Sequence, residues 1–186
     1  WVTAVAISPD GRCIASAGSE GNLFIRFVDP NNPDRPSRPY VTLSGHKSRV
    51  WSLGFSADGS TLYSAGEGGN VFIWDIPSAQ YNRQLDSGQE LPILATMSGN
   101  ARWIAVGLRD GTVQLWNLEN GQMVAAELKH ESRITGLSFT PDNVSLATVS
   151  AAGEFILWSV TDNAPHLSPR IYRPDDAGRV YAGKIS

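Results

Sequence analysis

A pattern that recurs at nearly constant spacing is the strongest constraint on how this chain can fold. An apolar stretch runs into a short polar turn in "AVAISPDG", "SLGFSADG", "LATMSGN" and "GLSFTPDN". The serine or threonine that opens each turn lies at positions 8, 56, 98 and 140, so the steps are 48, 42 and 42 residues. Ser186 would open a fifth copy 46 residues further on. Periods in the forties indicate an array of stacked units.

Within each unit the apolar residues recur with a period near two, which is typical of short strands. In the second unit "RVWSLGF" is followed by a polar turn and then by "TLYSA". A turn with glycine comes next ("EGGN"), and a third strand follows ("NVFIWDI"). Glycine suits that turn because it adopts positive φ without steric cost. A less regular fourth strand closes each unit, and four antiparallel strands make one blade of a β-propeller.

Three short motifs carry a family resemblance: "SPDG" at 8–11, "GH" at 45–46 and "WD" at 74–75. With four units in register over essentially the whole chain, the sequence resembles a run of WD40 repeats. The resemblance implies an all-β fold, with four four-stranded antiparallel blades forming part of a ring. We place the blades at about 1–46, 47–88, 89–130 and 131–177, and the first strand of a further blade at 178–186.

WD40 blades share a buried hydrogen-bond network, and the resemblance assigns its positions here. The network joins a histidine, a Ser or Thr, an Asp and a Trp, because buried polar groups without partners cost about 1–3 kcal/mol each. The positions that match are His46, Ser64 and Trp74 in the second unit, Asp110 and Trp116 in the third, and His130, Thr148 and Trp158 in the fourth. The positions that depart are Gly68 and Ala152 for the aspartate, and Gly88 and Val106 for the histidine and the hydroxyl. The first unit keeps Ser16 but has Glu20 and Arg26.

Two of the three histidines therefore occupy equivalent repeat positions, which a scaffold requires and a single catalytic cluster does not. We interpret His46 and His130 as structural. Without the aspartate, water or another group must orient each histidine ring, and we expect individually weaker blades held by stacking on their neighbours. The third histidine, His166, lies in a proline-rich stretch, where we expect a solvated loop.

Composition excludes several classes of function. The net charge of −3 argues against bulk attraction to nucleic acid or anionic membranes. A single cysteine, Cys13, rules out an internal disulfide framework, and no Cys/His spacing fits a metal site. "GRVYAGK" at 178–184 lacks the Ser or Thr that a phosphate-binding loop needs. We expect no enzyme activity, no cofactor, no metal, no membrane contact and a cytoplasmic location.

Function is expected on the face that WD40 propellers use to bind partners. The resemblance puts this top face at the loops into each first strand and between each second and third strand. The candidate partner-binding residues there are Arg49, Trp51, Glu67, Arg109, Arg133, Arg179 and Tyr181. Arginine and aromatic residues are enriched at binding hot spots, so the set favours a protein or peptide partner of acidic character. The alternative is that Trp51 and Tyr181 belong to the core and the arginines only solvate the rim.

The chain begins at Trp1, and its four units fall short of the seven blades most common in this family. We expect a part of a longer propeller; closure by a second copy, or covering of the ends by a partner, are the alternatives. The alanine-rich style of "VTAVAISPDGRCIASAG" also resembles repeats of large bacterial signalling proteins. An interaction scaffold in such a multi-domain protein is therefore the first hypothesis, and a self-assembly module is the second.

Two proline-rich inserts, 29–39 and 162–176, lengthen connections toward the outer strands. Proline presets an extended backbone, so they are predicted to be ordered spacers, with peptide docking as the alternative.

Overall fold

The computed structural model describes residues 1–29, 31–36, 40–78, 80–88, 91–124, 128–160, 170–174 and 180–184. These residues contain strands and turns, and among them there is no helix long and apolar enough to cross a membrane. The strands form four antiparallel sheets, one for each repeat unit. The predicted all-β fold with four propeller blades is therefore confirmed.

Each blade is built from consecutive strands. Blade 1 contains β1 (Val2–Ile7), β2 (Cys13–Gly18), β3 (Leu23–Asp29), β4 (Asn32–Pro36) and β5 (Val41–Leu43). Blade 2 contains β6 (Val50–Phe55), β7 (Thr61–Gly66), β8 (Asn70–Asp75) and β9 (Gln80–Asp86). Blade 3 contains β10 (Pro92–Met97), β11 (Trp103–Leu108), β12 (Thr112–Asn117) and β13 (Leu128–Lys129). Blade 4 contains β14 (Ile134–Phe139), β15 (Ser145–Ser150), β16 (Phe155–Ser159), β17 (Arg170–Pro174) and β18 (Val180–Lys184).

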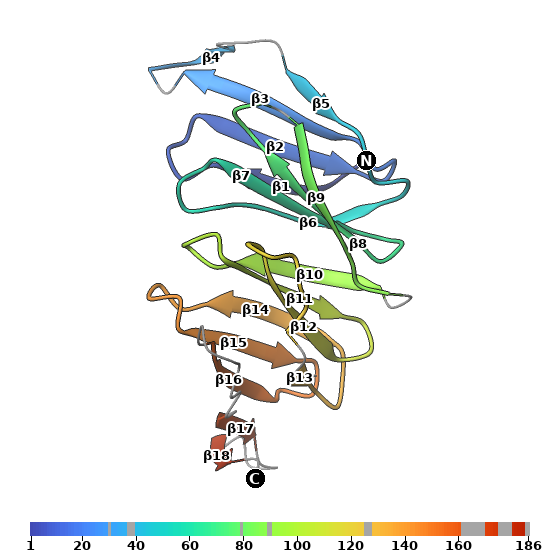
Figure 1. Ribbon diagram of the computed structural model, residues 1–186, viewed down its shortest axis with the longest axis vertical. Coiled ribbons are helices and arrows are strands. Elements are labelled where there is room, and N and C mark those ends of the chain that lie inside the picture. Colours follow the sequence, from blue (N-terminus) through green and yellow to red (C-terminus); the bar gives the residue numbers. More distant parts are fainter. Residues whose placement is uncertain are drawn as a thin grey trace.

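The first strands of successive blades lie next to one another. β1 contacts β6, β6 contacts β10, and β10 contacts β14, so these four strands form one continuous inner row. Figure 1 shows the four sheets following one another along the long axis, from the blue N-terminal end to the red C-terminal end. This order, with the first strand innermost, is the arrangement of blades around a propeller axis.

Alternate residues of one strand pack against opposite neighbours, and this explains the period of two in the sequence. In β7, Leu62 belongs to the core shared with blade 1, whereas Tyr63 belongs to the core shared with blade 3. A third core joins blades 3 and 4 around Trp103 and Trp158. The Tyr63 hydroxyl also donates a hydrogen bond across the blades to the Ala95 carbonyl, at 2.9 Å. Each blade therefore depends on its neighbours for its core.

Glycine is required in the turn between the second and third strands. Gly111 has a φ of +91°, and a Cβ atom there would lie 2.7 Å from the carbonyl oxygen of His130. Gly21 has a φ of +82°, and its missing Cβ would collide with the carbonyl oxygen of His46. Because glycine has no Cβ atom, the backbone that leads into the next blade can pack closely against this turn.

The last strand departs from the prediction. Residues 178–186 were expected to begin a further blade, but β18 pairs antiparallel with β17 and becomes the fifth strand of blade 4. The backbone groups of a strand need hydrogen-bond partners, and the outer edge of β17 supplies them.

Candidate functional site

Blade 2 holds a buried chain of polar groups at its interface with blade 1. Trp74 Nε1 donates to Ser64 Oγ at 2.9 Å, and Ser64 Oγ lies 2.8 Å from His46 Nε2. The serine hydroxyl therefore accepts the indole proton and shares a second hydrogen bond with the imidazole, which links all three side chains. The His46 ring meets Phe72 edge to face, with 4.5 Å between ring centroids.

Blade 4 repeats this chain and extends it by one carboxylate. Trp158 Nε1 donates to Thr148 Oγ1 at 2.8 Å, and Thr148 Oγ1 lies 2.7 Å from His130 Nε2. His130 Nδ1 lies 2.8 Å from Glu154 Oε2, and both side chains are buried. Glu154 therefore orients the histidine, in place of the aspartate that Ala152 replaces.

Sequence reasoning missed Glu154 because it lies two positions beyond the expected aspartate. The signal that could have found it is an acidic residue placed directly before the apolar run "FILWSV".

Burial keeps both histidines uncharged. It lowers the pKa of His46 to about 4, with the Ser64 contact acting in the opposite direction. Burial also lowers the pKa of His130, although the negative charge of Glu154 opposes the shift. The two rings are thus neutral near pH 7.

The order Glu154–His130–Thr148 has the connectivity of a nucleophilic triad. However, Thr148 is 0% exposed, and its oxygen already accepts the Trp158 proton. A nucleophile needs access to a substrate atom, which this hydroxyl lacks. The arrangement is scaffold, and so is the equivalent one in blade 2.

In blade 3 the two predicted network members are not joined. The indole Nε1 of Trp116 is buried without a hydrogen-bond partner, because Val106 stands where the other blades have a hydroxyl. Asp110 is exposed and accepts instead from the Thr112 backbone N–H and from Lys129 Nζ. With Gly88 at the histidine position, no imidazole is there for the carboxylate to orient.

Val106→Thr is therefore expected to raise the free energy of unfolding by about 1 kcal/mol, since the new hydroxyl would accept the Trp116 proton. Val113→Thr, on the next strand of the same sheet, adds a buried hydroxyl that has no unpaired indole N–H beside it. It should lower the stability by roughly 1–2 kcal/mol. Urea unfolding of the two variants tests this, and an equal loss in both would contradict it.

The top face is shaped by a β-bulge at the same place in every blade. Each first strand shifts register against the second near its beginning, which leaves one residue unpaired. The unpaired residues are Thr3, Trp51, Ile93 and Thr135. Backbone N–H groups of the second-to-third-strand turns close the bulges by bonding to the carbonyls of Trp1, Arg49, Leu91 and Arg133. Bulges redirect side chains, and here they do so along one edge of all four sheets.

Blade 2 presents the most developed group on this edge. Trp51 is 40% exposed, and the Arg49 guanidinium carbon lies 4.8 Å from the centroid of its ring. Glu67 is exposed beside them, and its backbone N–H bonds to the Arg49 carbonyl at 2.7 Å. A large aromatic surface thus carries a stacked cation at the top of the blade.

Of the other predicted top-face residues, Arg109 and Arg133 are exposed at the tops of blades 3 and 4. Arg179 lies outside the described residues, and of Tyr181 only the backbone is described, paired with Arg173 in blade 4. The bulge residue Ile93 is partly buried and packs against the core between blades 3 and 4. His166, for which a solvated loop was predicted, also lies outside the described residues.

Cys13 is buried and forms no disulfide. Within the described ranges, no group of three or more His, Cys, Asp or Glu side chains is arranged to hold a metal ion.

Comparisons with known proteins agree with this geometry. The WD domain, G-beta repeat family matches residues 1–25, 37–75 and 92–117. The chain is 30% identical over 178 residues to the target of rapamycin complex subunit LST8 of Mus musculus, covering 93% of this chain and 53% of that protein. It is 27% identical over 167 residues to WD repeat-containing protein 90 of Xenopus tropicalis, covering 89% of this chain and 9% of that protein. The chain thus spans about half or less of these relatives' lengths.

Both relatives are eukaryotic proteins, so they lend no support to the predicted resemblance to bacterial signalling proteins. Among solved structures, the computationally designed Ika4 protein matches with a TM-score of 0.72 at 23% identity, over 87% of this chain and 92% of that chain. That likeness supports the fold alone. The repeat motifs, the family match and the blade architecture together show that this chain belongs to the WD40-repeat family of β-propeller proteins.

Proposed function

We propose that this chain is a non-catalytic scaffold that binds an acidic segment of a partner protein through the top face, within a longer multi-domain signalling protein. The observation that carries the proposal is the exposed Trp51 with Arg49 stacked on its ring. The stacking already restricts two long side chains, so less conformational entropy is lost when a partner binds.

The charge at this edge favours an acidic partner. Arg49, Arg109 and Arg133 are exposed there, against the exposed carboxylates of Glu20 and Glu67 in the second-to-third-strand turns. The third carboxylate of these turns, Asp110, is already paired with Lys129. Arginine donates several hydrogen bonds in a planar fork that matches a carboxylate. One relative is by its printed name a subunit of a protein complex, which is in keeping with a binding role.

The double variant Arg49→Ala/Trp51→Ala should recover at least roughly tenfold fewer clones than the wild type from a phage-displayed library of acidic peptides. Its circular dichroism spectrum should be unchanged, because both side chains are exposed. Arg12→Ala/Val144→Ala removes one exposed arginine and one exposed apolar residue at the opposite edge and serves as the matched control. Equal recovery by both double variants would overturn this assignment of the binding face.

Self-assembly is the second candidate function, favoured by the outer faces of the end blades. Val5 is 59%, Ile7 63% and Phe24 42% exposed on blade 1. On blade 4, Val149 and Leu157 are only half-buried, whereas their counterparts in the other blades are buried. Exposed apolar faces of this kind mark association surfaces.

Light scattering distinguishes the two functions. Homodimerisation through the end blades predicts twice the monomer mass for the wild type and the monomer mass for Phe24→Asp. A wild type that stays monomeric at high concentration would exclude closure by a second copy, and it would leave the top-face proposal intact.

A further inference from the structure

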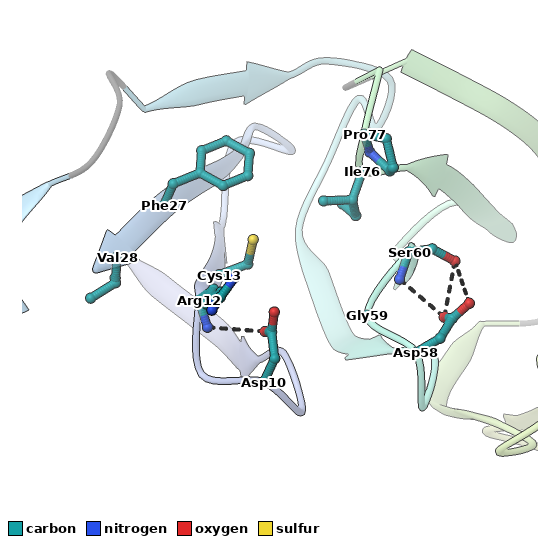
Figure 2. Close-up of a pocket in the computed structure, with 10 residues that line it drawn as sticks. All are labelled: Asp10, Arg12, Cys13, Phe27, Val28, Asp58, Gly59, Ser60, Ile76 and Pro77. Atoms are coloured by element: carbon teal, nitrogen blue, oxygen red, sulfur yellow. Dashed lines mark hydrogen bonds between the residues drawn. The ribbon is translucent and has the colours of Figure 1, made fainter. Parts of the chain in front are cut away.

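A cavity of about 510 Å³ opens between blades 1 and 2, at the edge of the sheets opposite to the top face. Blade 1 contributes the β1–β2 turn, the start of β2 and the end of β3; blade 2 contributes the β6–β7 turn and the loop after β8. The lining residues used below are Asp10, Arg12, Phe27, Asp58, Ile76 and Pro77. Figure 2 shows the Phe27 ring directed toward Ile76 across the cavity, with the Cys13 sulfur below the ring on the same side.

The repeat architecture alone does not require this cavity. The corresponding space between blades 2 and 3 measures only about 180 Å³. In blade 2 the outer strand β9 pairs along β8 as far as Asp75, whereas β5 pairs only with Leu23–Ile25 of β3. Beyond the end of β5, Val28 pairs with Pro36 of β4. Residues Asn32–Pro36 of the first proline-rich insert thus take the place of the outer strand beside the cavity.

The chemistry of the lining is mixed. Phe27, Ile76 and Pro77 provide an apolar surface. The Ser8 hydroxyl and then the Arg12 backbone N–H lower the pKa of Asp10, and the Ser56 hydroxyl and the Ser60 N–H do the same for Asp58. Both carboxylates are therefore ionised at neutral pH. Against these two charges the lining offers one cation, Arg12, so the cavity is negative overall.

Asp10 retains capacity to bind a cation. Its two hydrogen bonds, from Ser8 Oγ at 2.6 Å and from the Arg12 N–H at 3.0 Å, both go to Oδ1. The second carboxylate oxygen is thus available to a ligand. Asp58 accepts from Ser56 and Ser60, and its Oδ2 atom still has room for a further donor.

We propose that this cavity binds an extended peptide segment in which a bulky apolar side chain stands beside a lysine or arginine. The apolar side chain would lie between Phe27 and Ile76, and the cation would be held by Asp10 and Asp58. Pockets of several hundred Å³ with apolar walls and a few placed polar groups are typical ligand sites. This site is independent of the top face, which is proposed to prefer the opposite charge.

Another blade of the same chain shows that asparagine can replace the aspartate of this turn, which removes the negative charge and keeps the hydrogen bonds. In blade 3, Asn100 occupies the aspartate position and accepts the same two bonds, from Ser98 Oγ at 2.7 Å and from the Arg102 N–H at 3.1 Å. Asp10→Asn/Asp58→Asn should therefore fold normally. Asp142→Asn changes the equivalent turn of blade 4, away from the cavity, and is the matched control.

The test is an NMR titration with three capped peptides that alternate leucine with lysine, with glutamine or with glutamate. The lysine peptide should shift the amide signals of Arg12, Ser60 and Ile76 saturably, and the other two should bind at least roughly tenfold more weakly. The Asp10→Asn/Asp58→Asn variant should lose a similar factor, whereas Asp142→Asn should lose nothing. Equal binding of the lysine and glutamine peptides, shifts centred on Arg49 and Glu67, or no saturable shift would each overturn the proposal.

Discussion

Trp74→Ala is expected to lower the free energy of unfolding by about 3–5 kcal/mol. The indole is 2% exposed in the core between blades 1 and 2, and it stacks on Phe72 with 5.5 Å between ring centroids. Its removal leaves a cavity between the blades and also takes away the donor that holds Ser64 toward His46. Urea unfolding followed by circular dichroism measures the loss.

Trp116→Ala is the matched control, because Trp116 occupies the same strand position in blade 3. Its side chain is only half-buried, and its Nε1 atom has no hydrogen-bond partner to lose. We expect at most about half the loss seen for Trp74→Ala. Equal losses in the two variants would mean that the polar network contributes no stability beyond that of burying the indole ring.

Stability is expected to fall as the pH is lowered from about 6.5 toward 4. The pKa of His46 lies near 4 in the folded state against 6.5 for an exposed histidine, so the unfolded chain takes up the proton first. Neutral His46 therefore contributes about 3 kcal/mol to the free energy of unfolding above pH 6.5. This contribution is lost progressively as the pH falls to 4. His130 acts in the same direction, because burial lowers its pKa as well.

The variant His46→Gln separates this effect from acid denaturation through carboxylates. Asp10, Asp58 and Asp142 have pKa values lowered from 3.8, so their contributions are lost only at still lower pH. Between pH 6.5 and 4 the variant should show a much flatter dependence of the unfolding midpoint than the wild type. A variant with the same slope as the wild type would rule out His46 as the titrating group.

The blade architecture could be predicted because it follows from local patterns. The period of two in the strands, the turn serines and the glycines of the second turn each reflect a backbone requirement that recurs in every unit. The pairing of β18 could not be predicted, because it depends on which strand edge is available in space. The repeat pattern identifies Val180–Lys184 as a strand but does not fix its neighbour.

The positions of the hydrogen-bond network were recognisable in the sequence, but the carboxylate that orients His130 was not. Glu154 reaches His130 only because the turn "SAAGE" places the carboxylate two residues later than the family pattern does. The unsatisfied indole of Trp116 follows from Val106, which was visible in the sequence. The cavity between blades 1 and 2 arises from the short pairing of β5, which no local pattern encodes.

Hydrogen–deuterium exchange on the chain bound to a selected acidic peptide tests the central claim most directly. Binding at the top face predicts protection of the backbone amides around Arg49–Trp51 and Glu67, with weaker protection near Arg109 and Arg133, and no change in the β1–β2 and β6–β7 turns. Protection confined to those two turns, or to the outer faces of blades 1 and 4, would show that the partner does not bind the top face and would contradict the account.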